Sequence, residues 1–346
     1  MKKFFLVPIE PLPERYSTQW ISWFGKEFNR HNIDHEFIFG KELTSKIEVG
    51  SFLDVYGTNY YKAHQLTLII EKIRNKEVKD GDVIFFFDLW FPGLEMLQYI
   101  RQGAEIDFKI CGVFHAGTYD EGDFLFHKGM ASWGEMLENS WLNFIDVIFV
   151  ATDFHKQLIL EKRKVVSDKI KVTGLPLYFS DYSEFNLEKE NIVVFPHRLD
   201  IEKQPYLFDE VKDRLRNKYP NWHFIKSKEY ISRYSEDKQK EEYYRLLSKS
   251  KISVSFALQE TWGIAMQESL FYGCKILVPK RLSYLEMYLP AFKFSTMEEF
   301  YSKLIKLMDG LEEDSFQEAM RLNSFRLKQS GVNAISQMIL NMENGL

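Results

Sequence analysis

The sequence has few cysteines and no long apolar run. Only two of its 346 residues are cysteine, Cys111 and Cys274. Two cysteines exclude a disulfide framework and a multi-cysteine zinc site, so we expect a reducing compartment, the cytoplasm. The absence of 18 consecutive apolar residues predicts no transmembrane helix. The apolar start, Phe4 to Val7, is too short for a signal peptide and predicts a buried strand.

An excess of positive charge is also absent. The net charge is -5, with 21 Lys and Arg against 25 Asp and Glu in the first 178 residues and 24 against 25 in the rest. Neither half therefore resembles a basic nucleic-acid-binding domain. The glycine motifs G-x-G-x-x-G and G-x-x-x-x-G-K-[ST] are missing, which disfavours a nicotinamide dehydrogenase and a P-loop kinase or ATPase. Aromatic residues, in contrast, make up 16% of the chain, and we expect most of the 30 Phe in the core.

Short apolar runs alternate with amphipathic stretches along the chain. Strands are expected near residues 4–7, 34–39, 83–87, 109–114, 147–150 and 170–173, and again near 191–195, 222–225, 252–256 and 275–278. Helical patterns lie between them. Repeated strand–helix–strand units form parallel sheets covered on both faces. The pattern predicts an α/β fold with two doubly wound, Rossmann-like domains facing across a cleft.

A polar segment separates the two series of strands. Residues 179–190 have no clean period, and we interpret them as the linker between an N-terminal domain, residues 1–178, and a C-terminal domain, residues 191–346. The final helix, expected near 314–342, could pack back on the N-terminal domain. In paired domains of this kind a ligand binds where the carboxyl ends of the strands face each other.

The most informative segment follows the strand near 252–256 and opens a helix. The backbone N–H groups of residues 261–264 then lie at a helix N-terminus, which favours a phosphate-bearing ligand. These residues are Thr261, Trp262, Gly263 and Ile264. Glu260 precedes the helix and Glu268 lies inside it, about 12 Å apart along the axis if the spacing is helical. That spacing suits two carboxylates holding hydroxyls of an extended ligand. It is equally consistent with a Glu260 that complements the helix dipole in the first turn and a Glu268 that is simply exposed to solvent on the helix.

A second segment follows the first strand of the C-terminal domain. Arg198 and Lys203 lie on one strand-to-helix loop, where two cations can neutralise a diphosphate. The alternative is two ordinary surface cations, although Lys203 in the first turn of a helix is disfavoured by the helix dipole.

Together these two segments resemble the retaining GT-B glycosyltransferases of the glycogen-synthase-like group, family four. That group has two glutamates separated by seven residues, as Glu260-Thr261-Trp262-Gly263 and Glu268-Ser269 are here. It also has R-L followed by E-K, matched by Arg198-Leu199 and Glu202-Lys203. The resemblance covers residues 191–290. It implies that Glu260 contacts donor-sugar hydroxyls, that Glu268 contacts the nucleotide ribose, and that Arg198 and Lys203 bind the diphosphate leaving group.

The N-terminal domain carries less of the resemblance. His115 follows a strand, where the family often has a histidine that contacts the transferred sugar; a capping or structural histidine is the alternative. The family's glycine-rich first loop is replaced by residues 8–20, in which Arg15, Ser17 and Thr18 could supply donors. The loop from Asp88 to Gly93 carries Trp90 and Phe91, which either line the cleft or pack in the core.

The resemblance implies transfer of a sugar from a nucleotide diphosphate sugar, most simply a UDP-sugar, to an acceptor hydroxyl with retention of configuration. No cofactor and no metal are implied, because cationic side chains take the place of the divalent ion. The acceptor expected for the family is a saccharide or cell-envelope molecule. The compact chain and atypical first loop also resemble phage glycosyltransferases, some of which modify hydroxymethylated pyrimidines in DNA.

Two other functions fit the same segments. One is a sugar-nucleotide epimerase or hydrolase of this fold, which would convert the nucleotide sugar fully without an acceptor. The other is a non-catalytic relative that binds a nucleotide sugar or a partner protein. The presence of both glutamates and both cations argues against the second of these.

Overall fold

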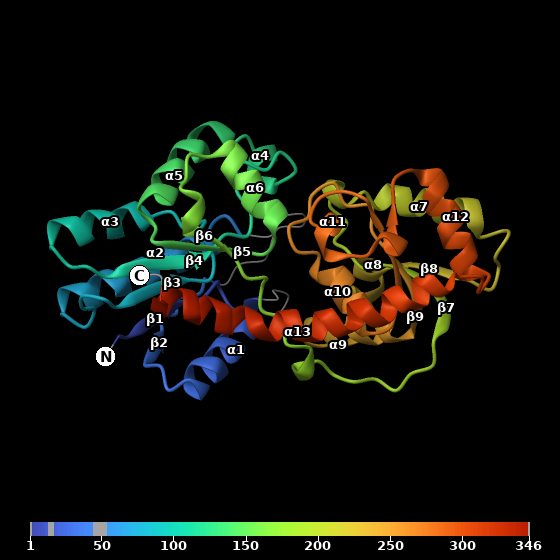
Figure 1. Cartoon of the computed structure of the whole chain (residues 1–346), viewed down its shortest axis with the longest axis horizontal. Helices are drawn as coiled ribbons and strands as arrows, with labels where there is room; N and C mark the ends of the chain where they lie inside the picture. Colours follow the sequence, from blue (N-terminus) through green and yellow to red (C-terminus); the bar gives the residue numbers. More distant parts are fainter. Residues whose placement is uncertain (1, 13–16, 44–53, 345–346) are drawn as a thin grey trace. The chain divides into compact units, whose positions relative to one another are not determined.

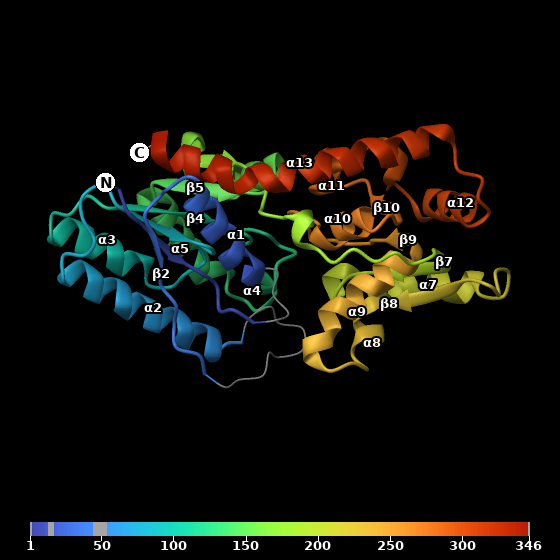
Figure 2. The same cartoon turned by 90° about the horizontal axis from the view of Figure 1, so that it is seen from below.

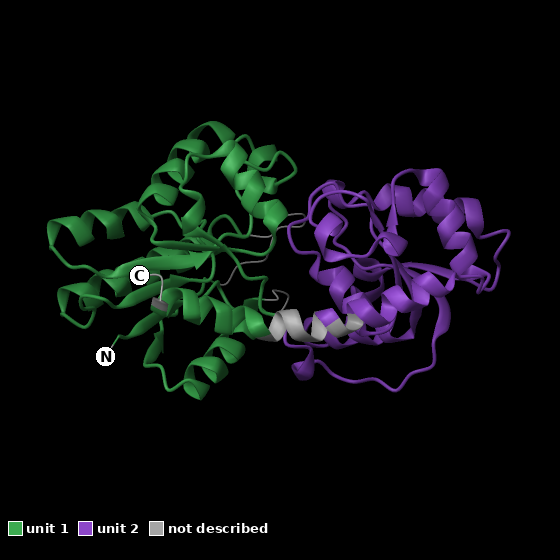
Figure 3. Ribbon diagram, in the orientation of Figure 1, with its two compact units in different colours: residues 1–176, 333–346 green, residues 177–332 purple. Residues whose placement is uncertain are grey.

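The computed structural model describes residues 2–12, 17–43 and 54–344, and the chain forms two compact units. The first unit comprises residues 1–176 and 333–346, and the second comprises residues 177–332 (Figure 3). The segment 179–190, predicted as a linker, is thus grouped with the second unit, and the final residues of the last helix are grouped with the first.

The first unit is built on a six-stranded parallel sheet with the strand order β2-β1-β3-β4-β5-β6. Its strands are β1 (Phe4–Val7), β2 (His35–Phe37), β3 (Val83–Phe86), β4 (Lys109–Val113), β5 (Val147–Val150) and β6 (Ile170–Val172). Its helices are α1 (Ser17–Arg30), α2 (Gly57–Arg74), α3 (Leu94–Gly103), α4 (Phe124–His127), α5 (Ala131–Phe144) and α6 (Asp153–Lys162), with the 3-10 turn η1 (Ser167–Lys169). Figure 1 shows α1 on one side of this sheet and α3 and α5 on the other.

Aromatic side chains fill the α1 side of this sheet. Phe24 of α1 packs on Phe85 and Phe87, with ring centroids 5.3 and 4.7 Å apart, and Phe28 packs on Phe4 at 5.2 Å. Alternate residues of a strand point to opposite faces. The neighbours Phe5, Ile84 and Phe86 therefore belong to the core under α2, α3 and α5. Burial on both faces explains why these strands are continuous apolar runs.

The second unit contains a five-stranded parallel sheet with the order β11-β10-β9-β7-β8. Its strands are β7 (Glu190–Phe195), β8 (His223–Lys226), β9 (Ser250–Val254), β10 (Lys275–Pro279) and β11 (Lys293–Phe294). Its helices are α7 (Pro205–Leu215), α8 (Ser227–Ile231), α9 (Glu236–Lys249), α10 (Ile264–Phe271), α11 (Tyr284–Met287) and α12 (Met297–Met308). Short 3-10 turns are η2 (Phe179–Asp181), η3 (Ile201–Lys203) and η4 (Pro290–Phe292).

The last helix is shared by the two units. Helix α13 (Asp314–Asn344) is continuous over 31 residues (Figure 2). Its residues up to Val332 belong to the second unit and those from Asn333 to the first. In the first unit, Lys2 donates through Nζ to the backbone oxygen of Met342 at 3.2 Å. Within the described part of the chain, neither α13 nor any other helix is both long and apolar enough to cross a membrane.

The predicted fold class is confirmed. Both sheets are parallel, and helices connect their strands. In open sheets of this kind the loops that follow the carboxyl ends of the strands form the ligand site. The loops after β7 and β9 therefore lie where a ligand is expected in the second unit.

Candidate functional site

Two loops of the second unit bring the predicted motifs together. Strands β7 and β9 are neighbours and run parallel, so both loops leave the same edge of the sheet. The backbone N–H of Leu258 donates to the backbone oxygen of Glu202 at 2.7 Å and ties the loops to each other. This pairing places the Arg198–Lys203 segment beside the segment that begins with Gln259.

Lys203 is buried between these loops. It is 6% exposed, and its Nζ donates to the backbone oxygen of Gln259 at 2.5 Å and lies 3.5 Å from Oε2 of Glu260. A buried ammonium group must be compensated by such partners, because removing it from water costs free energy. Lys203 and Glu260, chosen from the sequence, are thus in direct contact.

The Glu260 carboxylate closes the start of helix α10. Its Oε1 accepts hydrogen bonds from the backbone N–H of Gly263 at 2.7 Å and of Trp262 at 3.3 Å. Burial alone would raise the pKa of Glu260, but the charge of Lys203, with His197 and these N–H groups, holds that pKa below its ordinary value. Glu260 is therefore an anion at neutral pH.

The turn into α10 depends on a glycine. Gly263 has a φ of +59°, in the left-handed region, and a Cβ at this position would lie 2.8 Å from Cε1 of Tyr284. After this turn, Ile264 and Ala265 are the first residues of the helix. The N–H groups at the start of a helix have no carbonyl acceptor within the helix. Thr261 is partly exposed beside them and Trp262 is buried. The predicted helix N-terminus at residues 261–264 thus begins at Ile264.

Arg198 lies at the exposed rim of the same loop. Its side chain is 48% exposed, and its guanidinium pairs with Asp200 at 3.1 Å and with Glu202 at 3.4 Å. Both partners belong to its own loop. Arg198 therefore forms solvent-exposed ion pairs near Lys203. Such exposed pairs are weak, and the guanidinium can exchange partners at little cost.

Glu268 lies in a cluster of tyrosine hydroxyls. Its Oε1 accepts from Tyr182 at 3.0 Å and from Tyr244 at 3.3 Å, and its Oε2 accepts from Tyr243 at 3.0 Å. Glu268 is only 7% exposed. Burial raises its pKa, and the three hydroxyls together with Lys240 lower it only in part. Glu268 is thus a buried carboxyl group rather than the solvated helix position considered from the sequence.

The raised pKa of Glu268 gives a prediction. A raised carboxyl pKa means that the folded protein binds the proton more tightly than the unfolded chain does. Protonated Glu268 therefore stabilises the fold below about pH 4.5, and this stabilisation is lost as the pH rises through the pKa of Glu268 in the folded protein. We expect the thermal midpoint of Glu268→Gln, relative to wild type, to increase as the pH rises from about 4 to 7. Thermal scans at several pH values measure this difference, and a constant or decreasing difference would contradict the prediction.

His115 belongs to the first unit and is held by the backbone. Its Nε2 lies 2.7 Å from the backbone oxygen of Phe87, which can only accept, so Nε2 carries the proton. Its ring packs on Trp20 at 5.4 Å. Burial lowers its pKa despite the charge of Asp88. His115 is therefore a neutral, oriented imidazole, and its contact with sugar stays a prediction.

The aromatic loop after β3 packs in the core. Trp90 is 8% and Phe91 2% exposed, and the indole N–H of Trp90 donates to Glu138 at 2.9 Å. This favours the core alternative over a cleft lining. In the first loop, Arg15 lies outside the described residues, and Thr18 donates through its hydroxyl to the backbone oxygen of Leu12 at 2.6 Å.

Several residues that the sequence analysis did not select complete the site. Arg281, in the loop after β10, donates to the backbone oxygens of Phe256 at 2.7 Å and Ala257 at 3.0 Å, and so supports the Glu260 loop. His197 is buried next to Arg198. The position of His197 two residues after the end of a strand was the available signal for it; no pattern in the sequence indicated Arg281.

Metal-binding groups do not converge in the part of the chain that the structure describes, where no three His, Cys, Asp or Glu side chains form a possible metal site. The acidic pair Asp80 and Asp82 instead caps backbone groups: Asp82 accepts from the N–H groups of Lys3 and Lys79, each at 2.8 Å. Asp80 accepts from the N–H of Asp107 at 2.8 Å.

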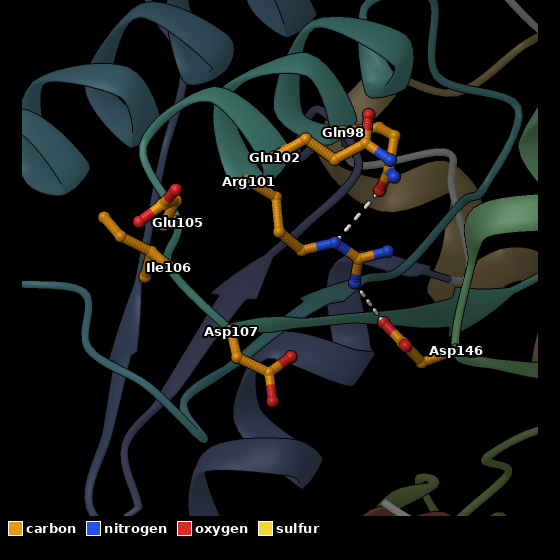
Figure 4. Close-up of a pocket in the computed structure, with 7 residues that line it drawn as sticks. All are labelled: Gln98, Arg101, Gln102, Glu105, Ile106, Asp107 and Asp146. Carbon is orange, nitrogen blue, oxygen red and sulfur yellow. Dashed lines mark hydrogen bonds and ion pairs between the residues drawn. The ribbon is translucent and has the colours of Figure 1, made fainter.

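A shallow pocket of about 420 Å³ lies elsewhere, between the end of α3 and the starts of β4 and β5 (Figure 4). Its central residue, Arg101, is fully engaged: it donates to Gln98, to Asp146 at 2.7 Å and to two backbone oxygens. The pocket lies at the amino ends of the strands, opposite the edge where α/β proteins bind ligands. We therefore assign the candidate site to the loops after β7 and β9.

Comparison with protein-family models gives no match. Solved structures, in contrast, match along the whole chain. Sucrose-phosphate synthase from Thermosynechococcus elongatus has a TM-score of 0.70 at 12% identity and covers 100% of this chain and 99% of its own. Anabaena HepE, solved with UDP and glucose, has a TM-score of 0.62 at 11% identity and covers 100% of both chains.

A third similar structure is the pneumococcal O-GlcNAc transferase GtfA in complex with UDP and GlcNAc. It has a TM-score of 0.59 at 11% identity and covers 99% of this chain and 98% of its own. At such identities a shared fold is established without a shared substrate. The chain has the GT-B fold of these glycosyltransferases.

Proposed function

We propose that this protein is a retaining glycosyltransferase that moves a sugar from a nucleotide diphosphate sugar to an acceptor hydroxyl. The observation that carries the proposal is the contact between the buried Lys203 and Glu260 at the start of α10. It places a cation, a carboxylate and a helix N-terminus at one strand edge, in a fold whose neighbours were solved with UDP and a sugar. A UDP-sugar is accordingly the donor that we propose.

Departure of the diphosphate is the step that these residues assist. As the bond between the anomeric carbon and the phosphate oxygen breaks, negative charge grows on the phosphate. Lys203, Arg198 and the N–H groups that head α10 offset that charge. Glu260 holds hydroxyls of the transferred sugar. The acceptor oxygen bonds to the anomeric carbon on the face from which the phosphate leaves, so configuration is retained. A phosphate oxygen of the leaving group takes the acceptor proton, so no side chain is required as base.

Glu268 is the residue that we propose to bind the ribose of the donor. Both of its oxygens already accept hydrogen bonds from tyrosines, so ribose hydroxyls must replace one of these donors. Tyr243 is the least buried of the three tyrosines and is the one that we propose to give way. The acceptor that we propose is a saccharide rather than DNA, because neither half of the chain is basic.

Incubation of the protein with UDP-, GDP- and ADP-sugars, followed by measurement of nucleoside diphosphate release, tests the proposal. We expect slow hydrolysis of one donor series, lost in Glu260→Gln, and faster release when the correct acceptor is added. The acceptor screen contains saccharides and hydroxymethylated DNA. Complete conversion without an acceptor would instead indicate a hydrolase or epimerase, and tight binding without turnover under every acceptor a non-catalytic relative.

A further inference from the structure

A buried imidazole in the loop of the proposed donor site has a nitrogen that no described residue pairs by a hydrogen bond. His197 lies two residues after the end of β7, is 5% exposed, and packs edge-on against Phe195 with ring centroids 5.2 Å apart. Its Nε2 is buried and makes no hydrogen bond with the described residues. Buried polar atoms are nearly always paired in folded proteins, so an unpaired one requires an explanation.

The surroundings of His197 are charged rather than apolar. Burial, together with the charges of Lys203 and Arg198, lowers its pKa to about 3, although the charge of Glu260 acts to raise it. The imidazole is therefore neutral at physiological pH and lies among the residues that we assign to the diphosphate and the sugar.

The hydrogen bonds among the described residues leave Nε2 of His197 unpaired. The Glu260 carboxylate already accepts from Gly263 and Trp262 and lies next to Lys203. The Tyr288 hydroxyl is a second buried group without a hydrogen-bond partner among the described residues, and burial together with the charge of Glu260 raises its pKa. Two buried groups that lack partners, both under the influence of the Glu260 charge, favour a site completed by a ligand that carries hydrogen-bond acceptors.

A phosphate group is the acceptor that this position favours. Lys203 and Arg198 attract an anion, and phosphate oxygens can only accept, so they select the tautomer of the neutral imidazole with its proton on Nε2. We propose that His197 is a phosphate-binding residue of the donor site, which donates its Nε2–H to the diphosphate held by Lys203. This inference rests on the proposed function and adds a recognition residue to it.

Two substitutions distinguish a phosphate-binding role of His197 from a role in packing alone. His197→Phe keeps a ring against Phe195 and removes the donor, whereas His197→Gln places an amide N–H near the position of Nε2. Titration calorimetry of UDP, GDP and ADP identifies the diphosphate that the wild-type protein binds. We expect His197→Phe to weaken that binding by about 10-fold or more, as loss of a hydrogen bond to a charged group does. We expect His197→Gln to bind within about threefold of wild type.

The matching nucleoside without phosphates is the internal control, and its binding should be the same in all three proteins. Equal diphosphate binding by wild type and His197→Phe would overturn the inference while leaving the proposed function intact. Equal weakening of nucleoside and diphosphate in both variants would also overturn it, because that pattern indicates a packing role. Failure of all three diphosphates to bind the wild-type protein would overturn the proposed function and this inference together.

Discussion

Replacement of Lys203 by methionine is expected to lower donor turnover by about 10²–10³-fold, the loss typical when one group that stabilises developing charge is removed. Methionine retains the volume of the buried stem but not the charge beside Glu260. The diphosphate of the proposed donor would then leave without the charge of Lys203. The rate of nucleoside diphosphate release from the donor, at saturating concentration, measures this loss.

The control for this substitution is Lys212→Ala, which removes an exposed lysine of α7. It should leave turnover unchanged, which excludes a general effect of net charge. Lys203→Arg should retain part of the activity that Lys203→Met loses. It keeps the positive charge, but the guanidinium does not fit the space between Gln259 and Glu260 as the ammonium group does. Wild-type turnover in a folded Lys203→Met protein would contradict a catalytic role for Lys203 and leave it a structural one.

The largest loss of stability is expected in the first unit, from Glu138→Ala. The Glu138 side chain is completely buried on α5 and pairs with Arg163 at 2.8 Å. It also accepts from the Trp90 indole and from the backbone N–H of Thr118 at 2.6 Å. Removal of the carboxylate leaves the buried guanidinium of Arg163 without its counter-ion and two N–H groups without an acceptor, which costs about 3–5 kcal/mol of unfolding free energy. Urea titration, with the unfolding of the two units fitted separately, measures this loss.

A nearby substitution serves as the reference for Glu138. Glu135→Ala removes an exposed carboxylate from the same helix and should change the unfolding free energy by less than about 0.5 kcal/mol. Glu138→Gln should have an intermediate effect, because the amide keeps the volume and one acceptor oxygen but loses the charge opposite Arg163. A loss below about 1 kcal/mol in Glu138→Ala would show that Arg163 finds other partners or water.

The fold could be predicted largely because both faces of each sheet are buried. Continuous apolar runs such as 83–87 and 147–150 correspond to β3 and β5, and the helical patterns between them correspond to helices. Short elements escaped prediction for a physical reason. Helices α4 and α11 have four residues each and strand β11 has two, so none spans enough of a period to leave a pattern.

The site could be predicted only where sequence position determines spatial position. Lys203 and Glu260 follow neighbouring parallel strands, so their contact is a consequence of the sheet order. The tyrosines around Glu268 could not be predicted in this way, because Tyr182 lies 86 residues away in the segment that had been interpreted as a linker. The unpaired nitrogen of His197 was equally hidden, since the absence of a partner is visible only after packing.

Helix α13 has a consequence for the order of folding. The residues that it adds to the first unit include four completely buried side chains: Ala334, Ile335, Met338 and Met342. During synthesis, residues 1–176 leave the ribosome well before these are made. The first unit would therefore finish folding after the second, although synthesis begins with it, and its nascent form would have an uncovered apolar surface in the meantime. Contacts between residues more than 300 positions apart, such as Lys2 with Met342, also predict a slow final step.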